Sequence, residues 1–104
     1  MLFDECVSLN IATMLTFNSG FSFRGGSAYR KNGVIYFDIG INCTALQSAG
    51  TSFTPFTVNS GYRPKTSASA CSQMASARIQ IDGTVALHAL ESNSIFWIAG
   101  SYLV

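Results

Sequence analysis

The alternation of apolar and polar residues constrains the fold of this chain more than any other feature. Between Ile35 and Cys43 the odd positions are all apolar, and the even positions carry tyrosine, aspartate, glycine and asparagine. Because successive side chains of a strand point to opposite faces, this pattern predicts a half-buried strand of nine or ten residues. Helical periodicity is nearly absent from the chain, so an all-β protein is expected.

Two turns are predicted with their geometry. Asn32-Gly33 is the strongest short hairpin signal. At Asp82-Gly83 a two-residue loop would mix the faces of the flanking strands, because the apolar residues in 77–89 all have odd numbers. A three-residue loop with Gly83 in the left-handed conformation keeps odd opposite odd. That register would turn Arg78, Ala86 and His88 outward together.

The remaining segments are less regular. We expect a strand in Cys6 to Ala12, and turns at Phe17 to Phe21 and at Gly61 to Pro64. Further expectations are a junction at Gly25-Gly26-Ser27, a polar loop from Thr44 to Thr54, a short strand at Phe56 to Val58, and a loop or short turn from Ser67 to Ala77.

The last strand, Ser94 to Val104, is apolar on both faces, which predicts that both faces are covered. A neighbouring subunit or the N-terminal segment could provide the cover, and both alternatives stay open. One face carries Ile95, Trp97, Ala99 and Leu103; the other carries Phe96, Ile98, Tyr102 and Val104.

Composition narrows the function. The 104 residues predict one domain, and a charged fraction of 11% against a usual ~25% favours a surface partly covered by other subunits. A net charge of +1 without a basic run argues against nucleic-acid binding. No apolar run approaches the ~20 residues of a membrane span. Three cysteines without CxxC spacing and one histidine argue against zinc and fit assembly in a reducing cytoplasm. No metal or cofactor is expected.

A series of short motifs resembles one family in its order. The series runs from Tyr29-Arg30-Lys31-Asn32-Gly33 through Gly61-Tyr62-Arg63-Pro64 and the Asp82-Gly83 hairpin to Ser101-Tyr102, about three-quarters of the chain. It resembles the tip (head) domain of bacteriophage tail-fibre and baseplate receptor-binding proteins from siphophages of Gram-positive hosts.

The resemblance implies a single antiparallel, jelly-roll-like β-sandwich head domain over residues 1–104, located in the virion after assembly in the bacterial cytoplasm. It implies a homotrimer that binds a host cell-wall saccharide and meets other tail or baseplate proteins through its N-terminal side. Residues 1–25 would be an extra strand pair or the remnant of an upstream shoulder. Trimerisation through the last strand would use Phe96, Ile98, Tyr102 and Val104.

Saccharide sites combine an aromatic platform with planar polar groups, which selects four candidate residues. Trp97 is the natural platform, with a core or interface anchor as the alternative. His88 is expected beside Arg78 on an outward face. It could hydrogen-bond the ligand, and a solvated strand residue without a binding role is an equal alternative. Arg63, fixed by Pro64, projects to the ligand or packs on Tyr62 and pairs with a carboxylate.

An enzyme is not expected, and no catalytic residues are assigned. A glycosidase needs two facing carboxylates, and only Asp38 and Glu91 offer such a pair. No serine has a nucleophile-elbow pattern around it. The alternatives to a receptor-binding tip are a purely structural virion domain that trimerises or docks another tail protein, and a monomeric bacterial carbohydrate-binding module.

Overall fold

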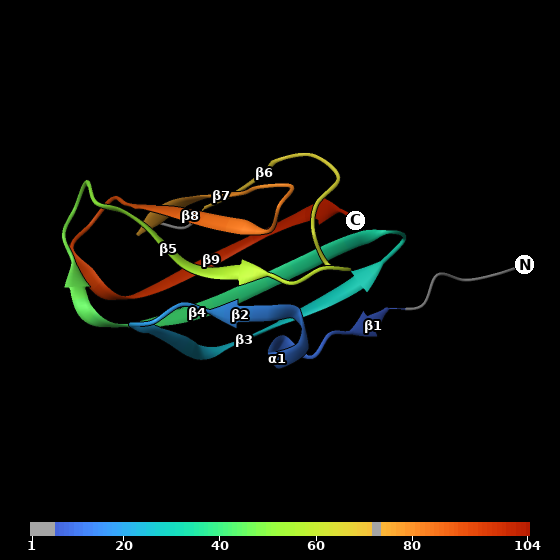
Figure 1. Ribbon diagram of the computed structural model, residues 1–104, viewed down its shortest axis with the longest axis horizontal. Helices are drawn as coiled ribbons and strands as arrows, with labels where there is room; N and C mark the ends of the chain where they lie inside the picture. Colours follow the sequence, from blue (N-terminus) through green and yellow to red (C-terminus); the bar gives the residue numbers. More distant parts are fainter. Residues whose placement is uncertain (1–5, 72–73) are drawn as a thin grey trace, which may run out of the picture.

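Two antiparallel sheets pack face to face in this protein, whose computed structural model describes residues 6–71 and 74–104 (Figure 1). The hydrogen-bonded order is β1-β3-β4-β9-β6-β7-β8-β5-β2. Among the described residues β6 meets β9 at a single pair, Cys71 and Ala99, so the sheet divides there into two layers. The predicted all-β sandwich is therefore confirmed.

The first layer contains the three longest strands and the short β1, and the second layer contains five strands of three to seven residues. The first comprises β1 (Val7–Ser8), β3 (Phe21–Lys31), β4 (Val34–Gln47) and β9 (Asn93–Leu103). The second comprises β2 (Leu15–Phe17), β5 (Ser52–Val58), β6 (Ala68–Cys71), β7 (Ala75–Ile79) and β8 (Thr84–Ala89), and a one-turn helix, α1 (Ile11–Met14), precedes β2.

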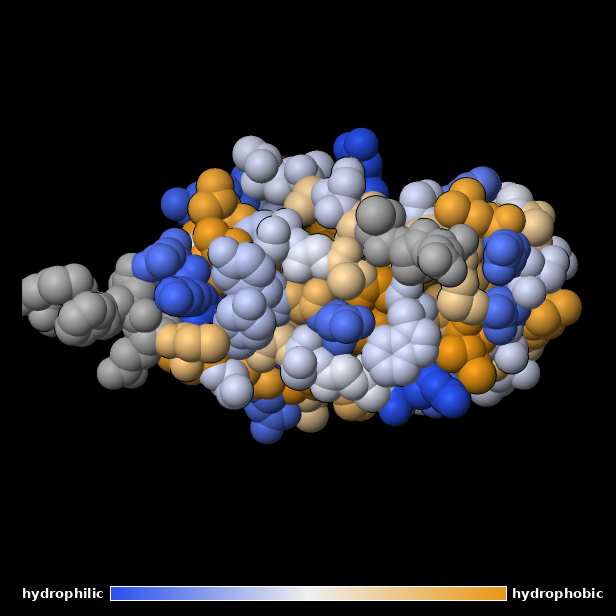
Figure 2. Space-filling view, turned by 180° about the vertical axis from the view of Figure 1, so that it is seen from behind, coloured by the Kyte–Doolittle hydropathy of each residue, from blue (hydrophilic) through white to orange (hydrophobic). Residues whose placement is uncertain are grey.

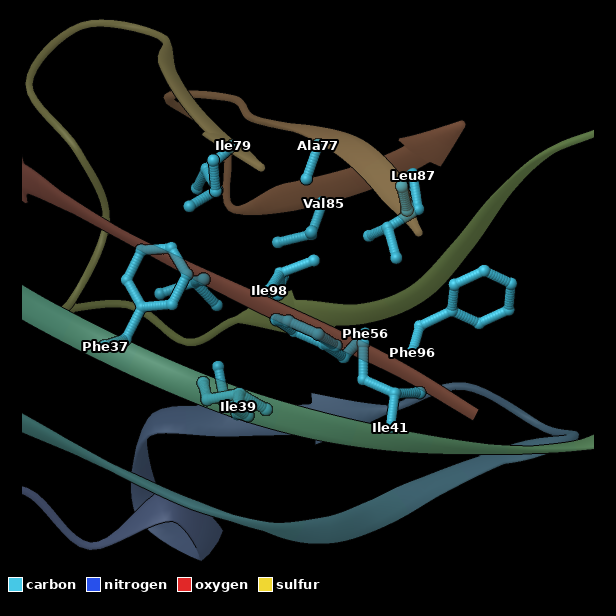
Figure 3. Packing of buried hydrophobic residues seen from close by; sticks show 14 of the residues in the cluster. Phe37, Ile39, Ile41, Phe56, Ala77, Ile79, Val85, Leu87, Phe96 and Ile98 are labelled. Atoms are coloured by element: carbon cyan, nitrogen blue, oxygen red, sulfur yellow. The ribbon is translucent and has the colours of Figure 1, made fainter. Parts of the chain in front are cut away.

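The core lies between the two layers (Figure 3). The odd-numbered residues of β4 between Ile35 and Cys43 are buried, as their alternation predicts. Across the gap, Phe53 of β5 packs against Phe96 of β9 with ring centroids 5.3 Å apart. Burial of each such side chain contributes about 1.5–3 kcal/mol, so this inner face supplies much of the stability. Cys43 is a small buried residue of this core, and burial raises the pKa of its thiol.

The Asn32-Gly33 turn is confirmed as a two-residue hairpin loop. Lys31 pairs with Val34, and both loop residues have positive φ angles of 55° and 71°. These angles define the type I′ turn, whose twist matches that of the flanking strands.

The turn between β7 and β8 is confirmed as a three-residue loop. Ile79 lies opposite Val85, so odd positions face odd positions. The Gly83 N–H donates to the Gln80 carbonyl at 2.9 Å, and Gly83 has a φ of 92°. Ile81 occupies the loop and is exposed, so the buried row ends at Ile79.

Three predicted segments differ from the structure. Cys6 to Ala12 is a strand only at Val7–Ser8, because the Asn10 side chain accepts a hydrogen bond from the Ala12 N–H at 2.9 Å and starts α1. Thr44 to Thr54 is not a loop throughout: β4 continues to Gln47 and β5 begins at Ser52. The prediction took the polar serines and threonines as a sign of a loop. They lie instead at exposed strand ends, where polar side chains are compatible with a strand.

Ser67 to Ala77 forms β6 and β7 in place of the predicted loop, with residues 72 and 73 outside the described part. Ala70, Ala75 and Ala77 are buried there. Small side chains without a strong apolar stripe are therefore part of the core here.

The N-terminal third joins the two layers. Gly25-Gly26-Ser27 is not a junction but part of β3, where the register shifts between Phe23 and Gly25 as in a β-bulge. The predicted turn after Phe17 is present, with the Phe21 N–H donating to the Asn18 carbonyl at 3.1 Å. Its flanking strands pair with different partners, β2 with β5 and β3 with β4, so this turn carries the chain from one layer to the other.

The subunit interface predicted for the last strand falls in the core. Phe96, Ile98 and Tyr102 are 0%, 1% and 5% exposed within one chain, because β9 lies between β4 and β6 and turns this face inward. Val104 is half-buried at the chain end. Side chains buried inside one chain are not available to a second subunit, so an interface on β9 would have to use its outer face.

That outer face is open in the single chain. Trp97, Ala99 and Leu103 are exposed along it. The described N-terminal strands pair elsewhere, β1 with β3 and β2 with β5, so they do not provide the cover that the sequence allowed.

The loop at Gly83 provides a test of the fold. A Cβ atom there would lie 2.2 Å from the Val58 carbonyl oxygen, whereas one at Gly50, with a similar φ of 88°, would meet nothing within 4 Å. We expect Gly50→Ala to lower the free energy of unfolding by about 1 kcal/mol, the conformational cost alone. Gly83→Ala should lower it by about 3 kcal/mol because strain and overlap add. Urea denaturation measures both, and equal losses would contradict the predicted contact.

Candidate functional site

The outer face of the first layer carries aromatic side chains in a fixed register. Because the Asn32-Gly33 loop sets Lys31 opposite Val34, Tyr29 falls opposite Tyr36. Their rings stack with centroids 5.0 Å apart and an interplanar angle of 16°. Both rings are about two-fifths exposed, so the pair forms an apolar surface in contact with solvent.

The next rows of this face hold a carboxylate and the only tryptophan. Asp38 lies between Ser27 of β3 and Ala99 of β9, and a shallow hollow there is lined by Ser27, Tyr29, Tyr36, Phe37, Asp38, Ala99 and Gly100. One row further, Gly40 lies between Gly25 and Trp97. We call Tyr29, Tyr36, Asp38 and Trp97 the aromatic face.

The Trp97 indole rests on the neighbouring strand. A Cβ atom at Gly40 would lie 2.7–2.8 Å from three atoms of the six-membered ring, and one at Gly25 would lie 3.5 Å from it. The near-equal distances mean that the ring presents its flat side to Gly40. Its opposite side faces outward, consistent with an exposed fraction of 37%. Trp97 is therefore a platform held parallel to the sheet.

Planar polar groups flank this platform. Asp38 and Asn42 precede and follow Gly40 by two residues on the same face of β4, so each lies about 7 Å from it along the strand. The Arg24 Nη1 donates to the Asn42 Oδ1 at 3.1 Å, which fixes the amide orientation. Figure 2, which views the molecule from behind relative to Figure 1, shows hydrophobic and hydrophilic residues interspersed over the face in view.

Two other predicted residues meet on the opposite layer. Arg78 and His88 both line a hollow on the outer face of β5, β6, β7 and β8, together with three serines. The predicted outward orientation of Arg78 and His88 is confirmed. We call the residues Ser52, Ser69, Ser76, Arg78 and His88 the serine hollow.

Arg63 lies apart from both surfaces. Its Nε donates to the Val58 carbonyl at 3.0 Å, and it lies against Gly83. Asp82 in that loop accepts a hydrogen bond from the Thr84 N–H at 2.9 Å. This hydrogen bond, with help from the Arg63 charge, lowers the pKa of Asp82. Arg63 thus braces the loop through a backbone carbonyl, and the Asp82 side chain stabilises the turn.

The four candidate residues therefore occupy three places: Trp97 on one layer, Arg78 and His88 on the other, and Arg63 at a turn. The sequence reasoning missed Tyr29, Tyr36 and the serines. The signal for the tyrosine pair was present, because a two-residue loop at Asn32-Gly33 already places Tyr29 opposite Tyr36.

The two carboxylates considered for glycosidase chemistry are far apart. Glu91 lies two residues before Asn93, which pairs with Gln47. Asp38 precedes Gln47 by nine residues, or roughly 30 Å along an extended strand. The carboxyl groups of a glycosidase pair lie within about 10 Å of each other.

Comparisons with known proteins give no family: no protein-family model matches the chain, and no curated protein matches it. Within residues 6–71 and 74–104, no helix has the length and apolarity to cross a membrane. In that same part, no three histidine, cysteine, aspartate or glutamate side chains gather in a group that could hold a metal ion.

The contact between Trp97 and Gly40 predicts a local displacement. Gly40→Ala would put a methyl group 2.7 Å from the indole, so the ring must lift off the sheet. We expect the emission maximum of Trp97, the only tryptophan, to shift to longer wavelength while circular dichroism is unchanged. Gly25→Ala is the matched control, because its Cβ would meet the ring at an ordinary 3.5 Å. Equal spectra for both variants would contradict the stacked arrangement.

Proposed function

We propose that this chain is a non-enzymatic attachment domain that binds a cell-surface saccharide through the aromatic face. One observation carries the proposal. The Trp97 indole is held parallel to the sheet by Gly40, with its outer side open and with Asp38 and Asn42 on either side. An apolar ring flanked by planar polar groups matches the C–H faces and hydroxyls of a sugar.

The geometry suggests how a saccharide would lie. A sugar ring stacks its C–H face on the indole, and its hydroxyls donate to Asp38 or exchange hydrogen bonds with Asn42 and Arg24. The stacked tyrosines begin four residues earlier along β4, about 13 Å from Gly40. A ligand that contacts both aromatic groups is longer than one sugar ring, which favours a polysaccharide.

The biological setting we propose is the tip of a bacteriophage tail. The order of motifs from Tyr29 to Tyr102 supports it, as does the exposed apolar surface at Trp97 and Leu103 on the outer side of β9. In this setting three chains associate, the saccharide belongs to the wall of a Gram-positive host, and other tail proteins attach on the N-terminal side.

A bacterial carbohydrate-binding module is the second candidate. The observation that favours it is the alignment of Tyr29, Tyr36 and Trp97 on one layer of a single chain. Such a strip needs no neighbouring subunit to contact a polysaccharide.

Removal of the platform tests saccharide binding directly. We expect Trp97→Ala to weaken binding of cell-wall polysaccharide from Gram-positive bacteria about tenfold, since the stacking contact is lost. Phe23→Ala is the matched control, because Phe23 is exposed to a similar extent, 40%, but lines a different hollow. Isothermal titration calorimetry measures both affinities. Equal losses, or no binding by the unaltered protein to any wall polysaccharide, would count against the proposal.

The molar mass in solution separates the two settings. Light scattering coupled to size exclusion should give three times the mass of one chain if the protein is a tail tip. A monomer that still binds saccharide would favour the bacterial module. A trimer that binds no saccharide would instead identify a purely structural virion domain.

A further inference from the structure

The serine hollow has a chemistry that differs from that of the aromatic face. We propose that it binds a phosphate group, either as inorganic phosphate or as a phosphate ester. The hollow lies on the other layer of the sandwich, so this inference does not rest on saccharide binding by Trp97.

Strand register assembles the hollow from four strands. In one cross-strand row His88 of β8 lies between Ser52 of β5 and Ser76 of β7. In the adjacent row Arg78 of β7 lies between Ala86 of β8 and Ser69 of β6. The five polar side chains are therefore brought to one surface by pairing, and each comes from a regular strand that holds its position.

A small residue opens the space between the larger ones. Ala86 lies beside Arg78 in the same row and two residues before His88 along β8. Ala86 lines the hollow, so a methyl group lies where a longer side chain would fill the depression. Arg78 and His88 line the hollow on either side of Ala86, so both flank a group bound there.

The charge of the hollow favours an anion. Arg78 is its one permanently charged lining residue, and the lining contains no carboxylate. No residue in the described part forms a hydrogen bond or ion pair with the Arg78 guanidinium, so its five N–H donors remain available. A guanidinium matches two oxygens of a phosphate with parallel hydrogen bonds.

The other polar groups add donors around the same space. The Ser52 hydroxyl and the His88 Nδ1 lie 3.1 Å apart, which fixes the imidazole ring. When Ser52 donates to Nδ1, the second ring nitrogen carries the proton and becomes a donor. The hydroxyls of Ser69 and Ser76 provide two further donors. A phosphate can accept all of these hydrogen bonds, whereas a planar carboxylate has only two oxygens to offer.

Titration by nuclear magnetic resonance tests the site. ¹⁵N-labelled protein is titrated with inorganic phosphate, glycerol 3-phosphate and glycerol at constant ionic strength set with chloride. Both phosphate compounds should shift the amide signals of Ser76, Arg78 and His88, and glycerol should not. Shifts with inorganic phosphate alone would also support the site and would identify its ligand as the free ion. Shifts with both compounds would show that the site also accepts a phosphate ester.

Two charge variants make the test specific. Arg78→Gln should weaken phosphate binding about tenfold or more, because charge-assisted hydrogen bonds are lost. Arg30→Gln removes the same charge from an exposed position on β3 and should leave binding unchanged. Thermal unfolding checks that each variant folds. Equal weakening in both variants would overturn the proposal, because it would reveal only non-specific attraction, and so would shifts confined to residues outside the hollow.

Discussion

The packing of the inner face of β4 and β9 against β5, β7 and β8 is the contact on which the rest of the structure depends. Ile39 and Ile98 face the second layer and are almost fully buried, and Phe96 contacts Phe53 across the gap. Because strand side chains alternate, burying these residues determines which residues point outward. A shift of one residue in β9 would bury Trp97 and expose Phe96. The core therefore sets the composition of both outer surfaces.

The two outer surfaces differ in chemistry because a small residue creates a different kind of space on each. On the first layer, Gly40 lacks a side chain and allows the Trp97 indole to lie against the backbone of β4. On the second layer, Ala86 leaves a depression between Arg78 and His88. One surface offers flat apolar contact with polar flanks, and the other offers a cation among hydroxyl donors.

Local geometry accounts for the parts of the fold that were predicted correctly. The Asn32-Gly33 and Asp82-Gly83 loops follow from backbone conformations that few residues adopt, and the alternation in β4 follows from strand geometry. The errors fall where local signals conflict with tertiary packing. The alanine- and serine-rich segment around Ala70 is strand because it pairs with its neighbours and buries its alanines in the core. The segment after Leu9 became helix because the Asn10 side chain caps the first turn of α1. The alternation in that segment was too short to outweigh this local hydrogen bond.

The sequence by itself determined the all-β class, both hairpin registers, and hence the meeting of Tyr29 with Tyr36. The meeting of Ser76 with His88 also required the segment predicted as a loop to become β7. The hairpin registers depend on loop length, which is a local property. The tertiary structure alone decided that Trp97 lies over Gly40, that Ser52 meets His88, and that Arg63 braces the Gly83 loop. Each of these contacts joins residues far apart in the chain. They depend on the order of the strands and on which face of β9 is buried, and neither is encoded in the residues around them.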